Sequence, residues 1–437
     1  MNRTTRRTAV RGAALLGALA LTLAACSGGG DDTDPQAAAE EGGELLVWAW
    51  DPTVEPIADA YMEANPDVTI ELVNAGTGND QYTALQNAFS AGSGIPDLAQ
   101  VEYYALPQFA IGESLADLTD LGAGDLEGTY TPGPWSAVQQ GDGIYGLPLD
   151  SGPMAMFYNA ELFEQHGIEV PTTWEQYVTA AQALQAADPN AYITSDTGDA
   201  GLATSLMWQA GGRPFQVDGT QVTVDLADEG SQQYAELWQR LISQDLLAPI
   251  SAWSDEWYQG LGNGTIATLV TGAWMPGNFV SGVPEGEGRW RVAPMPQWSE
   301  GESVSAENGG SAMSVTEASE NKALAYDFLE FASSGDGVAL RLEGGGFPAT
   351  VADLESDEYL AQESAYFGGQ KINEVLAQAA ADVADGWQYL PFQVYANSIF
   401  NDTVGQAYVS DTTVTDGLSA WQDQLVTYGN DQGFTVD

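Results

Sequence analysis

The stretch that decides the architecture is GIYGLPLDSGPMAMFYN, residues 143–159. It is apolar and extended on both sides of a polar break, Asp150-Ser151-Gly152-Pro153, where glycine and proline allow the chain to change direction. Two strands joined in this way suit a segment that leaves one lobe and enters another. We therefore predict a chain of two lobes that crosses between them at this break.

Upstream, apolar runs alternate with helical stretches: strands are predicted at 44–50, 68–73 and 96–102, and helices at 55–65 and 80–92. This β-α-β-α-β spacing predicts a parallel sheet covered by helices on both faces. In such sheets ligands bind beyond the carboxyl ends of the strands. Three stretches fall at those ends: Trp50-Asp51, the 74–79 loop and Glu102-Tyr103-Tyr104.

Downstream, a second lobe is predicted from helices at 159–166, 173–187, 199–210 and 228–244, a hairpin at 215–224 and a buried strand at 265–270. Gly309-Gly310 and Gly344-Gly345-Gly346 bracket an amphipathic helix at 322–332. These glycines are candidates for two further crossings between the lobes.

The N-terminus predicts export. Four arginines precede an apolar run at 12–25 that is too short for a permanent membrane span. Leu23-Ala24-Ala25-Cys26 resembles a bacterial lipobox, in which the cysteine is acylated after cleavage. We predict a signal peptide at 1–25, a lipid anchor on Cys26 and a flexible tether at 26–43. The mature protein is then expected on the outer face of the cell membrane.

The net charge of the chain restricts the class of ligand that it can bind. The chain has 62 acidic and 11 basic residues, a net charge of −51. Such a field repels nucleic acid and anionic headgroups, and it disfavours phosphorylated or dicarboxylate ligands. A neutral or cationic ligand is expected.

Enzyme motifs are scarce. His166 is the only histidine and Cys26 the only cysteine, so a zinc site of several imidazoles or thiolates is excluded, and no cofactor or metal is predicted. No G-x-S-x-G elbow or P-loop occurs. The single G-x-G-x-x-G, at Gly141, Gly143 and Gly146, leads into an extended segment rather than a helix, which argues against a dinucleotide site. A glycosidase remains an alternative, because it needs only two carboxylates and aromatic platforms.

The placement of the tryptophans favours a carbohydrate-binding site. Several of the 13 tryptophans, among them Trp50 and Trp274, stand beside glycine or proline in predicted loops. Indole faces stack on the C–H face of a pyranose, while carboxylates and amides bind its hydroxyl rim. Each such tryptophan has an equally good interpretation as a core residue, and for Trp48 and Trp238 the core is favoured.

Several motifs resemble a known family: VWAWDP, AGSGIPDLAQVEY, LADLTDL, IYGLPLDSGPMAMFYN, VPTTWEQY, GAWMPGN and GGFPAT. Together they are similar to the extracellular solute-binding proteins of ATP-driven sugar importers, which include maltose- and oligosaccharide-binding receptors. The resemblance implies an α/β fold of two lobes, each with a mainly parallel sheet, that close over a ligand. It implies crossings near Leu149–Gly152, Asn308–Ser311 and Gly345–Pro348.

Carried over to this chain, the resemblance implies a first lobe at 44–149 plus 311–345 and a second at 150–310 plus 346–437. The implied ligand contacts are Trp50, Asp51, Asn79, Glu102, Tyr103, Asp150, Trp208, Gln209, Trp274, Gly310, Ser311 and Phe347. The expected partners are a neutral sugar, with an oligosaccharide favoured, and the permease subunits of an ABC importer. The chain is expected to be a monomer that contacts the membrane only through its lipid anchor. A receptor for an amino acid, a peptide or a cationic metabolite remains an alternative.

Overall fold

The computed structural model describes residues 34–437, so the predicted signal peptide and Cys26 lie outside the described residues. The first described element is helix α1 (Pro35–Glu41), whose N-cap Asp34 accepts hydrogen bonds from the Gln36 and Ala37 amides. Ala39 is buried in the same core as helix α12 (Lys322–Ser333), and the two helices are in contact. The prediction of a flexible tether up to residue 43 is therefore wrong for α1, because this alanine-rich helix packs on the folded chain.

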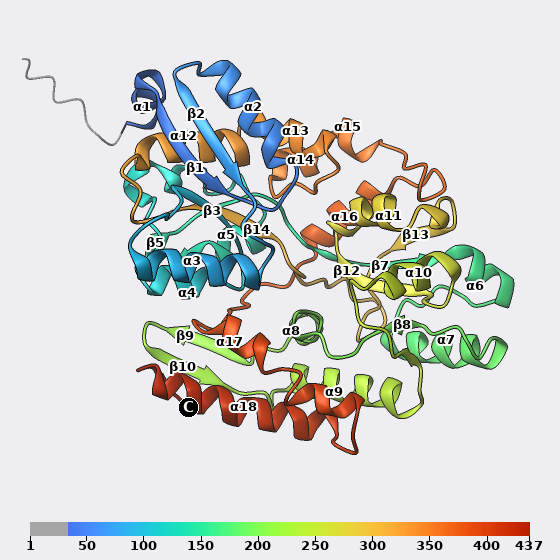
Figure 1. The fold of residues 1–437 in the computed structure, drawn as a ribbon. Helices are drawn as coiled ribbons and strands as arrows, with labels where there is room; N and C mark the ends of the chain where they lie inside the picture. The colour runs from blue at the N-terminus through green and yellow to red at the C-terminus, as the bar shows by residue number, and fades with distance from the viewer. Residues whose placement is uncertain (1–33) are drawn as a thin grey trace, which may run out of the picture. The chain divides into compact units, whose positions relative to one another are not determined.

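The first sheet has the strand order β2-β1-β3-β14-β6. Its strands are β1 (Gly43–Trp48), β2 (Val68–Val73), β3 (Leu98–Glu102), β6 (Leu147–Pro148) and β14 (Ser311–Val315). Strand β1 pairs in parallel with β2 and β3, as predicted, whereas β14 runs antiparallel to β3 and β6. In Figure 1, α2 (Val54–Ala64) and α12 lie on one side of this sheet and α3 (Asn79–Ala91) and α4 (Leu106–Ile111) on the other. We call this sheet and its helices the first lobe.

The second sheet, which belongs to the second lobe, has the order β12-β7-β13. Its strands are β12 (Thr268–Gly272), β7 (Met154–Asn159) and β13 (Trp290–Ala293), and both outer strands are antiparallel to β7. The prediction of a mainly parallel sheet is thus wrong for this lobe. A short apolar run indicates a buried strand but does not encode the direction of its neighbours. Helices α10 (Asp255–Asn263), α11 (Met275–Gly282) and α16 (Ile372–Ala381) share a core with Phe157 of β7.

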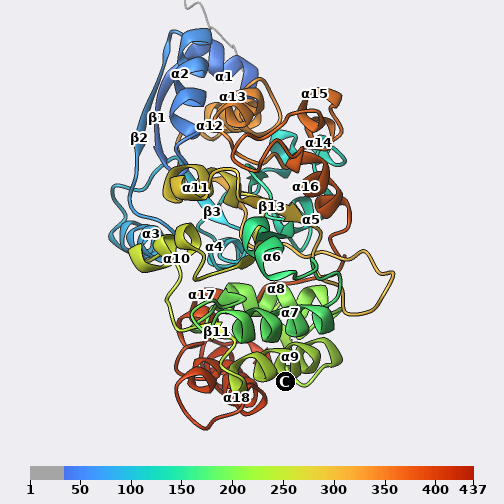
Figure 2. The same ribbon diagram turned by 90° about the vertical axis from the view of Figure 1, so that its right-hand side faces the viewer.

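The rest of the second lobe is largely helical. Helices α7 (Trp174–Ala187), α8 (Ala200–Gln209), α9 (Glu229–Ser243) and α18 (Val414–Asp431) pack with the hairpin β9 (Phe215–Asp218) and β10 (Gln221–Val224). In Figures 1 and 2, α9 lies beside α18. The side chains of Thr173, Asp199 and Asp228 cap α7, α8 and α9, and thus fix the helix starts that the sequence predicts.

Shorter α-helices and strands make up most of the remaining regular structure. They are α5 (Pro132–Ala137), α6 (Ala160–His166), α13 (Gly337–Glu343), α14 (Val351–Leu354), α15 (Asp357–Leu360), α17 (Gln393–Ser398), β4 (Gln139–Gln140), β5 (Gly143–Ile144), β8 (Thr194–Ser195), β11 (Leu247–Ala248) and β15 (Thr435–Val436). Across residues 34–437, no helix combines the length and the apolar character that a membrane span requires.

The chain passes between the two sheets at the segment with which the sequence analysis began. Strand β6 ends at Pro148 in the first sheet and β7 begins at Met154 in the second, so the polar break forms the first passage. A second passage leads from β13 back to β14 and includes Asn308. The two passages touch, since the Asn308 amide donates to the Gly152 carbonyl over 2.7 Å. A Cβ at Gly152 would collide with the Asn308 carbonyl, which explains the glycine at this position.

Candidate functional site

Gln100 of β3 joins the strand ends of the first lobe. Its Oε1 accepts hydrogen bonds from the backbone amides of Trp50 and Asp51, at 3.1 and 3.0 Å. Its Nε2 donates to Ser311 Oγ over 2.9 Å. Because the β1, β3 and β14 ends meet here, one buried amide fixes the position of three residues that the sequence assigns to the ligand site.

The network continues to the first passage through Asp150. Asp150 Oδ1 accepts from the Ser311 amide at 2.6 Å and from Ser311 Oγ at 3.0 Å. The Tyr103 hydroxyl donates to the Asp150 backbone carbonyl over 2.6 Å. Within residues 34–437, no hydrogen bond is recorded to Asp150 Oδ2. One carboxylate oxygen of Asp150 is therefore held by Ser311, and its ligand role stays a prediction.

Asp51 is tied to a buried arginine. Its Oδ1 accepts from the Thr53 amide and hydroxyl, at 2.8 and 2.7 Å, and its Oδ2 pairs with Arg341 Nη1. The Arg341 side chain is only 1% exposed. Both Asp51 oxygens thus bind groups of the first lobe. Asp51 thereby fixes the backbone at Thr53, next to the candidate site.

Glu102 lies at the carboxyl end of β3 among tyrosines. Its Oε2 accepts from the Tyr82 hydroxyl at 2.9 Å. Burial raises the pKa of Glu102 to about 7, although hydrogen bonds from Tyr82 and Tyr104 oppose the shift. Burial also raises the pKa of Asp150 to about 6, and nearby Asp51 adds to that shift. Hydrogen-bond donors stabilise the charged form of a buried carboxylate, and the hydroxyl groups of a ligand are such donors.

Glu307 clamps the two passages together. Its carboxylate accepts from the Ser151 hydroxyl at 3.0 Å and from the Gly152 amide at 2.6 Å. Burial raises the pKa of Glu307 to about 7. The next residue, Asn308, accepts from Thr271 Oγ1 and, through its carbonyl, from Trp274 Nε1 at 2.7 Å. Hydrogen bonds therefore tie the first passage to the second and the second to Trp274, while the covalent step from Asp150 to Ser151 joins this group to the network around Ser311.

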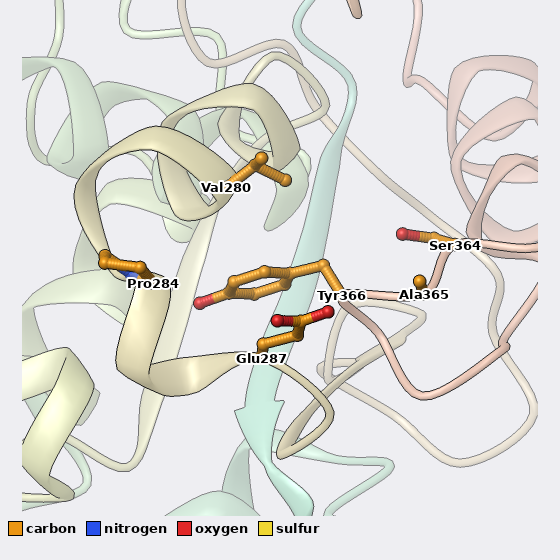
Figure 3. Close-up of a pocket in the computed structure, with 6 residues that line it drawn as sticks. All are labelled: Val280, Pro284, Glu287, Ser364, Ala365 and Tyr366. Atoms are coloured by element: carbon orange, nitrogen blue, oxygen red, sulfur yellow. The ribbon is translucent and has the colours of Figure 1, made fainter.

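The described chain has a hollow beside some of these residues and another hollow away from them. One, of about 440 Å³, is lined by Trp50, Asp51 and Asn74 together with Ala49, Pro52, Glu55, Ala58, Asp59, Met62, Ile70 and Leu72. A second, of about 370 Å³, lies on the second lobe (Figure 3). There the Tyr366 ring reaches toward Pro284, with the Glu287 carboxylate beside it, and the Tyr366 hydroxyl already donates to the Val283 carbonyl. None of the predicted ligand residues lines this second hollow. Within residues 34–437, no cluster of histidine, cysteine and carboxylate side chains could hold a metal ion.

Comparison with known proteins decides the family. The family model described as "Bacterial extracellular solute-binding protein" matches residues 50–339. The chain belongs to the bacterial extracellular solute-binding proteins.

Among solved solute-binding proteins, the ABC transporter associated binding protein of B. animalis subsp. lactis, in complex with β-1,6-galactobiose, is 46% identical with a TM-score of 0.83. The alignment covers 90% of this chain and 99% of that one. The galacto-N-biose-/lacto-N-biose I-binding protein of Bifidobacterium longum is 27% identical with a TM-score of 0.80, over 91% and 99%. A lactose-binding protein of Rhizobium radiobacter is 25% identical over 87% of this chain and 92% of its own length.

The structure places the remaining predicted residues in different surroundings. Trp208 and Gln209 are 5% and 2% exposed; Trp208 Nε1 donates to the Ala384 carbonyl, and Gln209 Nε2 donates to the Pro296 carbonyl. Phe347 is 2% exposed and packs edge-on against Tyr359. Asn79 is exposed at the start of α3, and Gly310 has a φ of 88° beside the Tyr103 ring. The ligand roles of these residues stay predictions.

Several residues that organise this solute-binding protein were not found from the sequence: Gln100, Glu307, Arg341 and Tyr389. Tyr389 packs against the cores of both lobes; burial raises the pKa of its hydroxyl, and nearby Glu307 and Glu102 add to that shift. Each of these four acts through partners that lie far away along the chain. No local motif marks such residues.

Proposed function

We propose that this solute-binding protein captures a short neutral oligosaccharide containing galactose and delivers it to an ABC importer. The observation that carries the proposal is that two hydrogen-bonded groups, Gln100–Ser311–Asp150 and Gly152–Asn308–Trp274, meet at the first passage. They set carboxylate acceptors and indole faces around the passages between two lobes. Sugar hydroxyls donate to the former and sugar C–H faces stack on the latter.

The relatives support the class of sugar. The structure that is 46% identical holds β-1,6-galactobiose, and the 27% identical one holds lacto-N-biose. The net charge of −51 also favours an uncharged ligand over a sugar phosphate. Several hydroxyl contacts and one or two stacked rings suit a micromolar dissociation constant, about −8 kcal/mol.

The mechanism is reversible capture. One lobe holds the sugar, rotation about the passages brings the other over it, and the permease binds the closed form. A ligand drives closure only by binding the closed form more tightly than the open form. A lipid anchor on Cys26 would keep the protein, as a monomer, at the outer face of the membrane.

A thermal-shift screen of the soluble domain tests the proposal. The panel comprises β-1,6-galactobiose, lactose, maltotriose, an arabino-oligosaccharide, glutamine and putrescine. We expect the galactosides to raise the unfolding temperature most, because binding to the native state stabilises it. A shift with glutamine or putrescine and none with any sugar would refute the proposal.

A further inference from the structure

Trp253 stands in the loop before α10 and differs from every other described tryptophan. Trp253 is 51% exposed, whereas none of the other tryptophans within residues 34–437 is exposed. Its backbone φ is +67°, in the left-handed region that disfavours bulky side chains. The chain therefore holds a large apolar ring in water on a strained backbone.

The loop fixes this conformation. Ser254 Oγ donates to the Ser251 carbonyl over 2.8 Å and caps α10 by accepting from the Trp257 amide at 3.2 Å. Strained residues of this kind persist where the surrounding structure holds them, and they gather at ligand-binding sites. A tryptophan that served only to cover the buried Trp257 would not need a left-handed backbone.

Trp253 extends the aromatic surface that begins at the second passage. Its ring centroid lies 5.6 Å from that of Trp274, with an interplanar angle of 32°, and 5.1 Å from that of Trp257. Trp274 is fixed by its bond to the Asn308 carbonyl, and Trp257 is 3% exposed. Of these three indoles, Trp253 has the most surface in solvent.

We propose that Trp253 is an outer sugar subsite that binds the ring of an oligosaccharide beyond the one at Trp274. This inference rests on the proposed function and deepens it. Trp253 lies directly beside Trp274, and an exposed indole offers its face to the C–H groups of a pyranose. The receptor then discriminates by chain length, because a third ring gains a contact that a disaccharide does not reach.

Calorimetric titration of the soluble domain with β-1,6-galactobiose and β-1,6-galactotriose tests the subsite. Trp253→Gly is the informative variant, since glycine adopts a positive φ without strain. We expect it to bind the trisaccharide about tenfold more weakly and the disaccharide nearly as well as the unchanged protein. Its unfolding temperature without ligand should stay equal or rise. Trp253→Phe, which keeps an aromatic face, should restore most of the lost affinity.

Val409→Ala is the matched control, because Val409 is 78% exposed on another part of the surface; it should alter neither affinity. A Trp253→Gly protein that binds both sugars normally would overturn the subsite while leaving the proposed function intact. A lowered unfolding temperature with unchanged affinity would assign Trp253 a packing role and also overturn the subsite. If the unchanged protein binds neither sugar, the proposed galactoside function fails first, and the subsite with it.

Discussion

Asp150→Asn separates ligand binding from folding at the first passage. Asp150 Oδ1 accepts two hydrogen bonds from Ser311, and burial raises its pKa from 3.8 to about 6. Asparagine keeps an acceptor for Ser311 but removes the charge and replaces the free oxygen with an N–H donor. The substitution should therefore weaken the bond to a sugar hydroxyl much more than it alters the fold.

The magnitudes follow from these contacts. A charge-assisted hydrogen bond contributes about 1.5–3 kcal/mol, so its loss weakens sugar binding about tenfold to a hundredfold. For folding, a pKa raised by about two units means that keeping Asp150 ionised at neutral pH costs roughly 3 kcal/mol. That net cost already includes the hydrogen bonds from Ser311, which oppose the upward shift of the pKa; removing the charge therefore gains at most this amount, and any misfit of the asparagine reduces the gain. The stability without ligand should thus stay level or rise slightly at pH 7.5. Below pH about 4, where Asp150 is protonated in both states, the gain disappears.

Calorimetric titration with β-1,6-galactobiose and thermal unfolding without ligand, both at pH 7.5, provide the two readings. Weaker binding with an unchanged or higher unfolding temperature supports the ligand role of Asp150. Normal sugar affinity combined with a lower unfolding temperature would refute it, and would show that the carboxylate serves only to hold Ser311 and shape the passage.

Four further experiments test other parts of the structure. Trp274→Ala should weaken sugar binding by about 1–3 kcal/mol with the circular dichroism spectrum unchanged, whereas unaltered affinity would remove this residue from the site. Glu307 has a pKa of about 7 in the folded protein and about 4.5 in the unfolded chain, so the free energy of unfolding should fall as pH rises between these values. Glu307→Gln removes this group and should make that fall less steep; equal slopes of unfolding free energy against pH for both proteins would count against this. Arg341→Met should lower the free energy of unfolding in urea titrations by about 3–5 kcal/mol, because it leaves the Asp51 carboxylate without its partner. Adding Asp51→Asn removes that unpaired charge and should restore much of the loss; additive losses would show that the two residues are not coupled. Cys26→Ser should release the full-length protein from membranes without changing its sugar affinity, and persistent membrane association would contradict lipid anchoring.

Local patterns were sufficient for most secondary structure. The strand at 68–73 has the predicted bounds, and the capped helices α7, α8 and α9 begin within one residue of prediction. These elements follow from apolar periodicity and cap residues, which are short-range properties. The antiparallel second sheet did not follow, because strand direction depends on how distant segments meet. The strand predicted at 265–270 occupies Thr268–Gly272, since Ile266 instead bridges to Tyr192.

The site shows the same division. Positions at predicted strand ends, such as Trp50 and Glu102, could be named because strand ends are visible in the sequence, whereas Ser311 was named only through the resemblance to the family. The partners that fix them could not: Arg341 reaches Asp51 across 290 positions, and Glu307 reaches Ser151 across 156. In the sequence, Arg341 and Glu307 cannot be distinguished from surface residues, because the residues that pair with them are far away along the chain.

The most direct test of sugar capture is a calorimetric titration of the unmodified soluble domain with β-1,6-galactobiose at pH 7.5. We predict saturable one-to-one binding with a micromolar dissociation constant. An absence of binding at millimolar sugar, from protein that unfolds cooperatively on heating, would contradict the proposal that this receptor captures a short galactoside.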